Sequence, residues 1–242
     1  LVKYILSKYE KYLLGSVDLV TFASKGLLKD QTKILPHRVS NTVIYNGFWK
    51  REKIKNKIQY TINNKKQIRL CYTGSLYGGS RSIETVIKFM SRNMKYRLSI
   101  AVYEKFDYNL ILDLIEKYGV KKESIDLYLN VGREQSILMQ EESDILLLLL
   151  RTDGKDRSYP TAKLFEYMES GKFVLGVGVT DCEANEIIKK TNIGMFVNHN
   201  ELSSFDVNVI DSVTYYNSNI YEYSRCAQVT VLNDYICNAI LQ

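Results

Sequence analysis

Residues 159–167 carry the clearest chemical pattern in the sequence, YPTAKLFEY. Proline is pre-organised for a helix start, so the segment predicts a helix over 161–170. Lys163 and Glu166 stand three residues apart and would share one face of that helix. A helix N-terminus with a lysine suits a phosphate, and a carboxylate one turn further on can accept two hydroxyl hydrogen bonds, as a ribose diol offers. The alternative is a surface ion pair, worth only a few tenths of a kcal/mol.

Two loops could bring further binding groups to this helix. Residues 151–158, RTDGKDRS, follow a buried apolar run, and a buried strand that ends in a charged loop indicates a ligand rim. Residues 74–81, GSLYGGSR, contain three glycines that would let backbone N–H groups approach an anion, with Arg81 at the opening of the next helix. The alternative for the second loop is a plain glycine-rich turn that ends in a helix-start arginine.

Several other kinds of chemistry are not supported by the residues. There is no G-x-G-x-x-G for a nicotinamide cofactor, no Walker-type loop and no G-x-S-x-G. No Asp-x-Asp occurs, and His37 and His199 have no partners at metal spacing, so we expect no metal and no cofactor. The four cysteines stand far apart without a C-x-x-C, which favours free thiols in a reducing compartment.

The elements that must position these residues alternate between two patterns. Short apolar runs rich in β-branched residues predict strands at 68–73, 97–103, 124–130, 144–150, 173–177 and 193–197. Helical patterns lie between them at 81–93, 107–118, 134–142, 161–170 and 183–190. This alternation predicts an α/β fold with a doubly wound, Rossmann-like parallel sheet. The unbroken apolar run of 144–150 supports it, because such a strand is covered on both faces.

The two ends of the chain read differently from its middle. The first part predicts a helix over 2–13, a strand at 18–23, a short helix at 24–29 and a second strand at 42–45, closed by an Asn46-Gly47 turn. Two strands do not make a stable sheet alone, so residues 1–49 read as the end of one domain. Residues 50–67 read as a basic linker, 68–220 as a whole second domain, and 221–242 as a long helix that could reach back to the first segment.

Composition and charge indicate which classes of binding partner to expect. The chain has 242 residues and a net charge of +6, of which the run 50–57, KREKIKNK, supplies +4. A solvated linker is the plain interpretation of this run, and a patch that contacts anionic lipid is the sharper one. Nucleic-acid binding is not expected, because no binding motif accompanies the charge. The longest apolar run has six residues, and the charged N-terminus is no signal peptide, so neither a membrane span nor secretion is predicted.

Three stretches together resemble the carboxyl-terminal half of a GT-B glycosyltransferase of family 4, the glycosyl transferases group 1. They are RLCYTGSLYGGSRSIETVIKFM, VGREQSILMQEESDILLLLL and YPTAKLFEYMESGKFVLGVGVTDCEANEIIKKTNIGMFV. The Lys-x-x-Glu-Tyr and Ser-Gly-Lys pattern of the third is the most specific. Upstream, VDLVTFASKGLLKD and VIYNGF look like the last elements of that family's amino-terminal, acceptor-binding domain.

The resemblance implies a role for each matching residue. Glu166 would bind the donor ribose, while Lys163, Arg81 and the backbone of residues 160–162 would hold the donor diphosphate. Gly132 and Arg133 would hold the nucleobase edge. The residues that match the donor site are Gly74, Ser75, Arg81, Gly132, Arg133, Ser158, Thr161, Ala162, Lys163 and Glu166.

Two positions depart from the family pattern. The family's Glu-x7-Glu would place its first glutamate, which contacts the transferred sugar, at Ser158. The common Gly-Arg pair reads Gly74-Ser75, so one phosphate-binding arginine is missing and Arg81 would have to replace it.

The function implied is a retaining hexosyltransferase-type enzyme that uses a nucleotide-sugar donor without a metal, in bacterial surface polysaccharide or glycolipid synthesis. The chain would be its donor-binding half, cytoplasmic and in peripheral contact with the inner face of the membrane. Its sugar or lipid-linked acceptor would bind the missing amino-terminal domain, so we expect no transfer by the chain alone. The alternative is a non-catalytic nucleotide-sugar-binding or partner module. A GT-B sugar epimerase fits less well.

Overall fold

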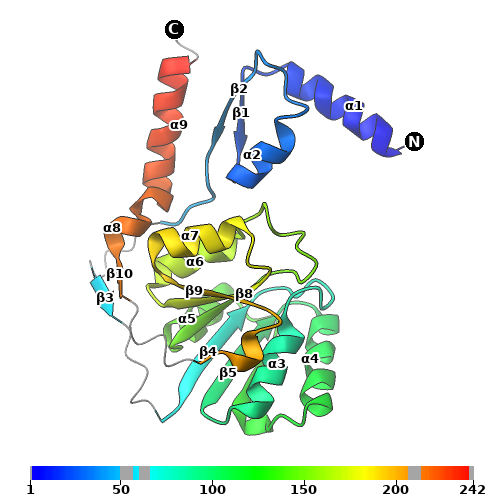
Figure 1. Ribbon diagram of the computed structural model, residues 1–242, viewed down its shortest axis with the longest axis vertical. Helices are drawn as coiled ribbons and strands as arrows, with labels where there is room; N and C mark the ends of the chain where they lie inside the picture. Colours follow the sequence, from blue (N-terminus) through cyan, green and yellow to red (C-terminus); the bar gives the residue numbers. More distant parts are fainter. Residues whose placement is uncertain (1, 50–56, 60–65, 207–213, 240–242) are drawn as a thin grey trace.

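The computed structural model describes residues 2–49, 57–59, 66–206 and 214–239. Its centre is a parallel six-stranded sheet with the order β6-β5-β4-β7-β8-β9 (Figure 1). The strands are β4 (Ile68–Thr73), β5 (Tyr96–Val102), β6 (Ile125–Leu129), β7 (Ile145–Leu149), β8 (Phe173–Gly178) and β9 (Gly194–Asn198). The predicted α/β fold and all six predicted strands are therefore confirmed.

Helices connect these strands and cover the sheet. They are α3 (Ile83–Arg92), α4 (Lys105–Lys117), α5 (Arg133–Glu141), α6 (Ala162–Ser170) and α7 (Glu183–Thr191), with short 3-10 turns at Lys122–Ser124 and Leu202–Ser204. We call residues 74–81 the glycine loop. The helix that follows this loop starts later than expected. Ser82 lies at its N-cap, so Arg81 belongs to the loop and pairs by a single bridge with Arg151.

β7 and β8 are buried along their whole length. The largest fully buried side chains are aromatic, among them Tyr72, Phe165, Tyr167 and Phe173. Tight packing also requires glycine in β8 and β9, since a Cβ on Gly176 would lie 2.2 Å from the ring of Phe196. The centre of the sheet thus carries the core.

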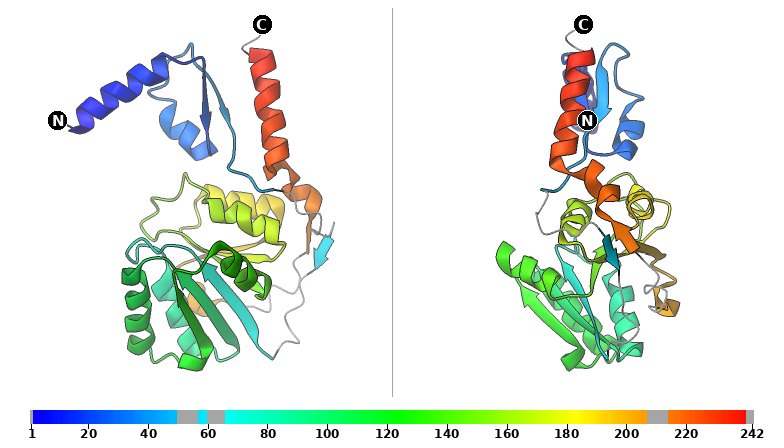
Figure 2. Two further views of the ribbon diagram at one scale, coloured as in Figure 1. Left: turned by 180° about the vertical axis from the view of Figure 1, so that it is seen from behind. Right: turned by 90° about the vertical axis from the view of Figure 1, so that its left-hand side faces the viewer.

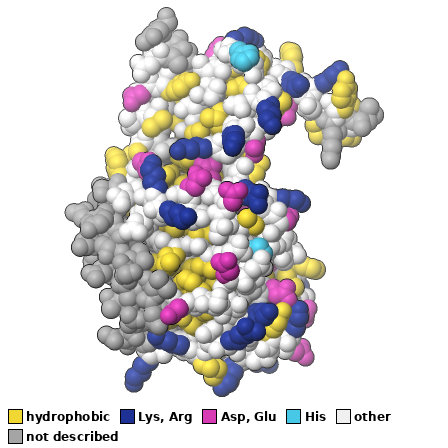
Figure 3. Space-filling model, viewed as in Figure 1, with side chains coloured by type: hydrophobic (Ala, Val, Ile, Leu, Met, Phe, Trp, Pro, Cys, Tyr) yellow, Lys and Arg dark blue, Asp and Glu magenta, His cyan; other side chains and the backbone are white. Residues whose placement is uncertain are grey.

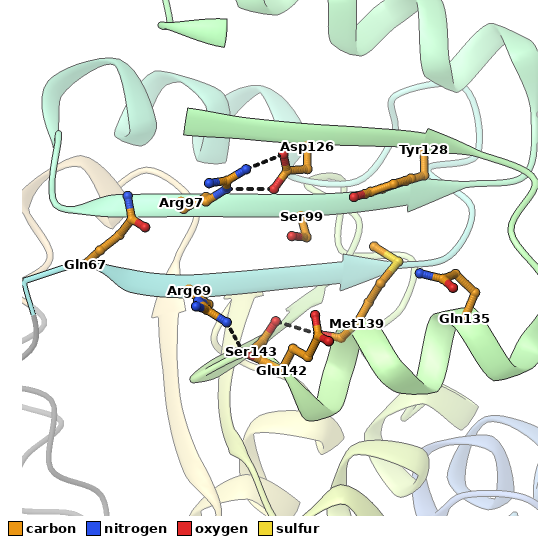
Figure 4. A pocket seen from close by; sticks show the side chains of 10 residues that line it. All are labelled: Gln67, Arg69, Arg97, Ser99, Asp126, Tyr128, Gln135, Met139, Glu142 and Ser143. Carbon is orange, nitrogen blue, oxygen red and sulfur yellow. Dashed lines mark hydrogen bonds and ion pairs between the residues drawn. The ribbon is translucent and has the colours of Figure 1, made fainter. Parts of the chain in front are cut away.

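One part of the sheet is polar instead. In the left view of Figure 2, α5 lies on the face opposite α3 and α4, and no described helix stands in front of β5 and β6. Figure 4 shows the side chains there, which line a hollow of about 250 Å³ beside α5. Arg97 of β5 forms a paired hydrogen bond with Asp126 of β6, at 2.8 Å for each contact. The Arg97 and Asp126 side chains keep 43% and 29% of their surface exposed, so this face of the sheet is in contact with solvent.

The first segment contains α1 (Val2–Gly15), β1 (Leu19–Phe22), α2 (Lys25–Gln31) and β2 (Ser40–Val43). The predicted helices and first strand are confirmed, and Gly47 has the positive φ of 63° that its turn requires. The second strand was expected at 42–45 but lies two residues earlier. Its register with β1 causes the shift, because Leu19 pairs with Ser40 and Phe22 with Val43.

The carboxyl-terminal part holds α8 (Asn217–Ile220), a 3-10 turn at Tyr221–Tyr223 and α9 (Arg225–Ala239). The helix expected over 221–241 therefore begins later, at Arg225, because the chain is extended at Ser224. Phe48 causes the break: its N–H donates to the Tyr223 carbonyl, and its carbonyl accepts from the Arg225 N–H at 2.8 Å. Beyond the break, α9 lies beside β2, where the Tyr235 hydroxyl accepts from the Asn41 N–H at 3.1 Å.

The sequence did not indicate a small antiparallel pair between β3 (Lys57–Gln59) and β10 (Thr214–Tyr216). Most of the predicted basic linker lies outside the described residues, and so does most of the KREKIKNK run. The domain boundaries at 49, 67 and 220 stay predictions.

Replacing one buried β7 leucine tests where the core lies. Leu148→Ala should lower the free energy of unfolding by about 2–5 kcal/mol in urea denaturation, because it leaves a cavity in a fully buried strand. Leu138→Ala is the matched control, since Leu138 is 50% exposed and its loss should change stability little. Equal effects of the two substitutions would contradict this account of the core.

Candidate functional site

The two predicted loops meet where the strand order reverses. β4 and β7 are neighbours in the sheet, but their chain connections run in opposite directions, and open α/β sheets bind ligands at such a point. The loop after β4 and the loop after β7 are joined there by hydrogen bonds. The Ser82 hydroxyl donates to the Leu150 carbonyl at 2.9 Å, and Arg151 Nη1 donates to the Ser80 hydroxyl at 3.0 Å. The sequence correctly indicated both loops, and the fold places them side by side.

Lys163 and Glu166 form the centre of a four-residue cluster. Lys163 Nζ lies 3.0 Å from Glu166 Oε1 and donates to the Thr73 hydroxyl, also at 3.0 Å. The Gln140 side-chain amide of α5 donates to Glu166 Oε1 at 2.6 Å and to the Thr73 hydroxyl at 3.1 Å. The predicted pair on one helix face is therefore confirmed. Thr73 and Gln140 were missed, because their partners are far away in the chain.

The start of α6 offers unused polar groups beside this cluster. Thr161 lies at the N-cap, where its side chain forms no capping hydrogen bond, and its Oγ1 is buried without a partner among the described residues. Uncapped N–H groups and the positive end of the helix dipole favour an anion. Thr161 and Ala162 therefore lie where an anion could be bound.

Arg81 supplies a second unsatisfied donor. Its Nη1 lies 3.4 Å from the Tyr72 hydroxyl, and its guanidinium lies over the Tyr77 ring, 4.8 Å from the centroid. Its Nε is buried and has no partner within the described chain. Lys163 approaches Gly74, since a Cβ built there would lie 3.8 Å from Lys163 Cε and 3.5 Å from the Tyr72 hydroxyl. The Tyr72 hydroxyl thus lies near both Arg81 and the first glycine of the loop.

A buried carboxylate of α4 organises the glycine loop. Asp107 is fully buried, and its two oxygens accept hydrogen bonds from the N–H groups of Leu76 at 2.6 Å and Gly78 at 3.1 Å. The Gly74 N–H donates to the Ala101 carbonyl at 2.9 Å. The N–H groups of Gly74 and Gly78, which the sequence suggested for an anion, therefore already have protein acceptors. The only signal for Asp107 in the sequence was its position at a predicted helix start.

The charged loop after β7 is held by its own side chains. Arg151 and Asp153 form an ion pair at 2.7 Å, and the hydrogen bonds from Arg151 hold the pKa of Asp153 below its ordinary value. The Arg151 N–H donates to the Asp156 carboxylate at 3.1 Å. The loop reaches Ser158 in an ordered conformation, and the Ser158 carbonyl accepts from the Ser24 hydroxyl at 2.6 Å.

Hydrogen bonds to Glu183, at the start of α7, hold the first segment beside the loop that ends at Ser158. Its carboxylate is buried and accepts from the N–H groups of Lys25 at 2.9 Å and Gly26 at 2.8 Å, and from the Tyr45 hydroxyl at 2.7 Å. Burial and this bond raise the pKa of Tyr45 well above its usual value. A cavity of about 320 Å³ opens beside these contacts, lined by α2, the Ser158 loop and the start of α7. Figure 3 shows charged side chains of both signs gathered at this junction.

Gly132 and Arg133 lie further from the centre. Gly132 is the N-cap of α5, in extended conformation, and Arg133 is exposed in the first turn. Gln140 follows Arg133 by seven positions, roughly 10 Å of helical rise. The predicted nucleobase contacts and the Glu166 cluster thus occupy opposite ends of one helix. Ligand binding by the ten predicted residues stays a prediction.

Solved structures share the architecture of this chain. The lipopolysaccharide outer core galactosyltransferase WaaB, in its apo form, aligns over 91% of this chain and 62% of its own, with 18% identity and a TM-score of 0.67. Anabaena Alr3699/HepE in complex with UDP-glucose aligns over 93% of this chain and 64% of its own, with 13% identity and a TM-score of 0.64. The chain has the fold of the GT-B glycosyltransferases. It spans less than two thirds of either protein.

A protein named for a different reaction also shares this architecture. The N-terminal domain of a Candida albicans trehalose-6-phosphate phosphatase aligns over 93% of this chain and 58% of its own, with 12% identity and a TM-score of 0.62. No protein-family model matches the sequence, and no curated protein matches it. The reaction must therefore be argued from the site residues.

Three further observations concern metal ligands, membrane-spanning helices and cysteines. In the described part of the chain, no group of three or more His, Cys, Asp or Glu side chains could hold a metal ion. None of the helices in the described ranges is long and apolar enough to span a membrane. The four cysteines are free, with Cys71 and Cys182 buried and Cys226 and Cys237 exposed.

Removing the Asp107 carboxylate tests its role in the glycine loop. Asp107→Ala should lower the free energy of unfolding by about 1–3 kcal/mol, because two loop N–H groups lose their acceptor. Asp113→Ala, an exposed position on the same helix, is the control in the same urea titration. A loss no larger than that of the control would show that the loop does not depend on Asp107.

Proposed function

We propose that this protein is a retaining glycosyltransferase that binds a nucleotide-diphosphate sugar in the crevice between β4 and β7. The observation that carries the proposal is the Lys163–Glu166 pair in the first turns of α6, at the strand-order reversal of a GT-B fold. In the reaction, the bond between the sugar's anomeric carbon and the diphosphate breaks, and a bond to an acceptor hydroxyl forms. The nucleoside diphosphate leaves, and the hydroxyl proton goes with it or to solvent.

The donor diphosphate would be held by groups that have no other partner. Arg81 Nε and Thr161 Oγ1 are buried donors without acceptors among the described residues, and both belong to segments that flank Lys163. The α6 N-terminus adds its N–H groups and dipole beside them, with Ala162 in the first turn. Together these groups favour the charge that accumulates on the leaving diphosphate as the glycosidic bond breaks.

The nucleoside would lie along α5. Glu166 would accept hydrogen bonds from the ribose hydroxyls, and the backbone at Gly132 and Arg133, at the other end of that helix, would hold the base. This order places base, ribose and diphosphate along one line from α5 to α6. Anabaena Alr3699/HepE forms a complex with UDP-glucose, and we propose a uridine nucleotide as the first donor to test.

The sugar itself would meet a serine instead of a carboxylate. Ser158 stands where the resemblance expects the first glutamate, and its carbonyl is bonded to Ser24. Gly74 and Ser75, beside Lys163, would line the opposite wall, and Ser75 Oγ lies 3.4 Å from the Asp107 carboxylate. Sugar selection would thus depend on hydroxyl groups more than on a charged pair.

For the whole protein we propose a role in bacterial surface polysaccharide or glycolipid synthesis, at the inner face of the membrane, with a sugar or lipid-linked acceptor. WaaB, whose name assigns it to the lipopolysaccharide outer core, supports this direction. We further propose that acceptor binding requires an amino-terminal domain of the GT-B kind, of which residues 1–49 are the last part.

A non-catalytic nucleotide-sugar-binding module is the second candidate. The serine at position 158 and the loop N–H groups already bonded to Asp107 both favour it, since each removes a group that could act on the donor. Both candidates bind a nucleotide diphosphate, but only the enzyme breaks the sugar–phosphate bond. Release of UDP from UDP-sugars, measured with and without acceptors, separates them.

Removing Glu166 tests the ribose contact. Glu166→Ala should weaken UDP binding by about 1.5–3 kcal/mol, the loss expected for hydrogen bonds to a charged group. Isothermal calorimetry on the folded variant measures it, with Glu116→Ala, an exposed position on α4, as the control. Unchanged affinity for UDP, GDP and ADP alike would remove Glu166 from the ribose site.

Metal dependence tests how the diphosphate is held. If Arg81, Lys163 and the α6 N-terminus carry the contact, UDP affinity should be nearly equal in magnesium and in a chelator. Calorimetry in the two buffers measures the difference. A loss of affinity on the order of tenfold on chelation would mean that a divalent ion bridges protein and diphosphate.

A further inference from the structure

The Gln140 side chain is buried directly behind Glu166. Gln140 is 2% exposed, on the last turns of α5, whereas the Glu166 side chain keeps 37% of its surface exposed. The Gln140 amide nitrogen lies 2.6 Å from Glu166 Oε1, 3.1 Å from the Thr73 hydroxyl and 3.5 Å from the Ser136 hydroxyl. A buried neutral side chain thus contacts the exposed carboxylate from the protein side.

Both donors to Glu166 use the same oxygen. Lys163 Nζ and the Gln140 amide each donate to Oε1, at 3.0 and 2.6 Å, and Oε2 accepts no hydrogen bond from the described residues. A carboxylate fixed by two donors on one oxygen has a defined plane, and its second oxygen keeps its full capacity to accept. Lys163 alone would not define that plane, because a long flexible ammonium side chain can follow the carboxylate as it rotates.

Gln140 achieves this without changing the charge of the site. An amide donor adds no cation, so Lys163 remains the ion partner of Glu166. The neighbouring titratable groups also stay constant near neutral pH. Burial raises the pKa of the Cys71 thiol on β4 to about 12 and the pKa of Tyr167 on α6 well above its usual value.

We propose that Gln140 is a positioning residue for nucleotide recognition: it holds Glu166 so that Oε2 faces the crevice and accepts from the ribose 2′- and 3′-hydroxyls. This rests on the proposed donor site, and it assigns the ribose selectivity of that site to a residue that never touches the ligand. A purely structural Gln140 would satisfy buried polar groups and leave selectivity for the diol unchanged when replaced.

The test compares UDP with 2′,3′-dideoxy-UDP, which keeps the base and the diphosphate but lacks the diol. The wild-type protein should bind UDP roughly tenfold or more tightly than the dideoxy analogue, the ratio that one charge-assisted hydrogen bond supplies. Gln140→Met keeps the length of the side chain and removes its donors, so the ratio should fall below about threefold. Gln135→Met, an exposed position on the same helix, is the matched control and should keep the wild-type ratio.

A second variant supplies a readout that packing cannot imitate. Gln140→Glu has nearly the same shape but places two carboxyl groups in contact, which raises the pKa of one of them. Below that pKa the protonated group donates to the other, so the UDP preference should be present at pH 5. As pH rises through the raised pKa the donor is lost, and the preference should fall. The wild-type ratio should stay level, because the diphosphate titrates alike in both ligands.

The outcomes separate the two proposals. A folded Gln140→Met protein that keeps the wild-type ratio, or a Gln140→Glu protein whose ratio does not change with pH, overturns the role of Gln140 and leaves the donor site standing. A wild-type protein that binds neither ligand, or binds both equally, overturns the donor site at Glu166 itself. If the methionine variant does not fold, the glutamate variant carries the test.

Discussion

The rest of the structure depends on burying β7 on both faces. Five consecutive apolar residues, Ile145–Leu149, form a strand only where helices cover each side of the sheet, and the pairing of β7 with β4 and β8 places it at the centre. No polar side chain can lie along such a strand, so the polar groups concentrate where it ends. The loop that begins at Arg151, the glycine loop across from it and the start of α6 are the positions left for chemistry. The strand-order reversal between β4 and β7 gathers them at one edge of the sheet.

The same reasoning explains what the sequence could predict. Strands and helices with a clear hydrophobic period were predicted correctly, because burial on one or two faces produces a regular pattern of apolar residues along the sequence. The Lys163–Glu166 pair was found for a related reason, since two residues three apart on a helix are neighbours in any fold. Register and interruption were harder to predict. β2 lies two residues before its predicted position, because its pairing with β1 sets its register. The last helix begins only after Ser224, because Phe48, far away in the chain, forms hydrogen bonds with the residues on either side of Ser224.

The residues that sequence reasoning missed share one property: each acts through a partner that is distant in the chain. Asp107 of α4 accepts hydrogen bonds from the glycine loop, and Gln140 of α5 donates to Glu166. Glu183 of α7 accepts hydrogen bonds from the start of α2. Each is a buried side chain whose type looks unremarkable in its own helix. A polar group is tolerated at such depth only when its hydrogen bonds are formed, so the folded structure is needed to see what it does.

Glu183 shows how strongly such a residue can couple two parts of the chain. Three donors from the first segment converge on its buried carboxylate, and Gly26 allows the approach, since a Cβ there would lie 2.5 Å from the Ser158 Cα. Moving α2 away from Glu183 would remove the Lys25 and Gly26 N–H donors from this carboxylate and expose the Ser158 carbonyl. An uncompensated buried charge is expensive, so the position of the first segment and the conformation around Ser158 are linked. The surroundings of Ser158 are therefore built jointly by the first segment and by the start of α7.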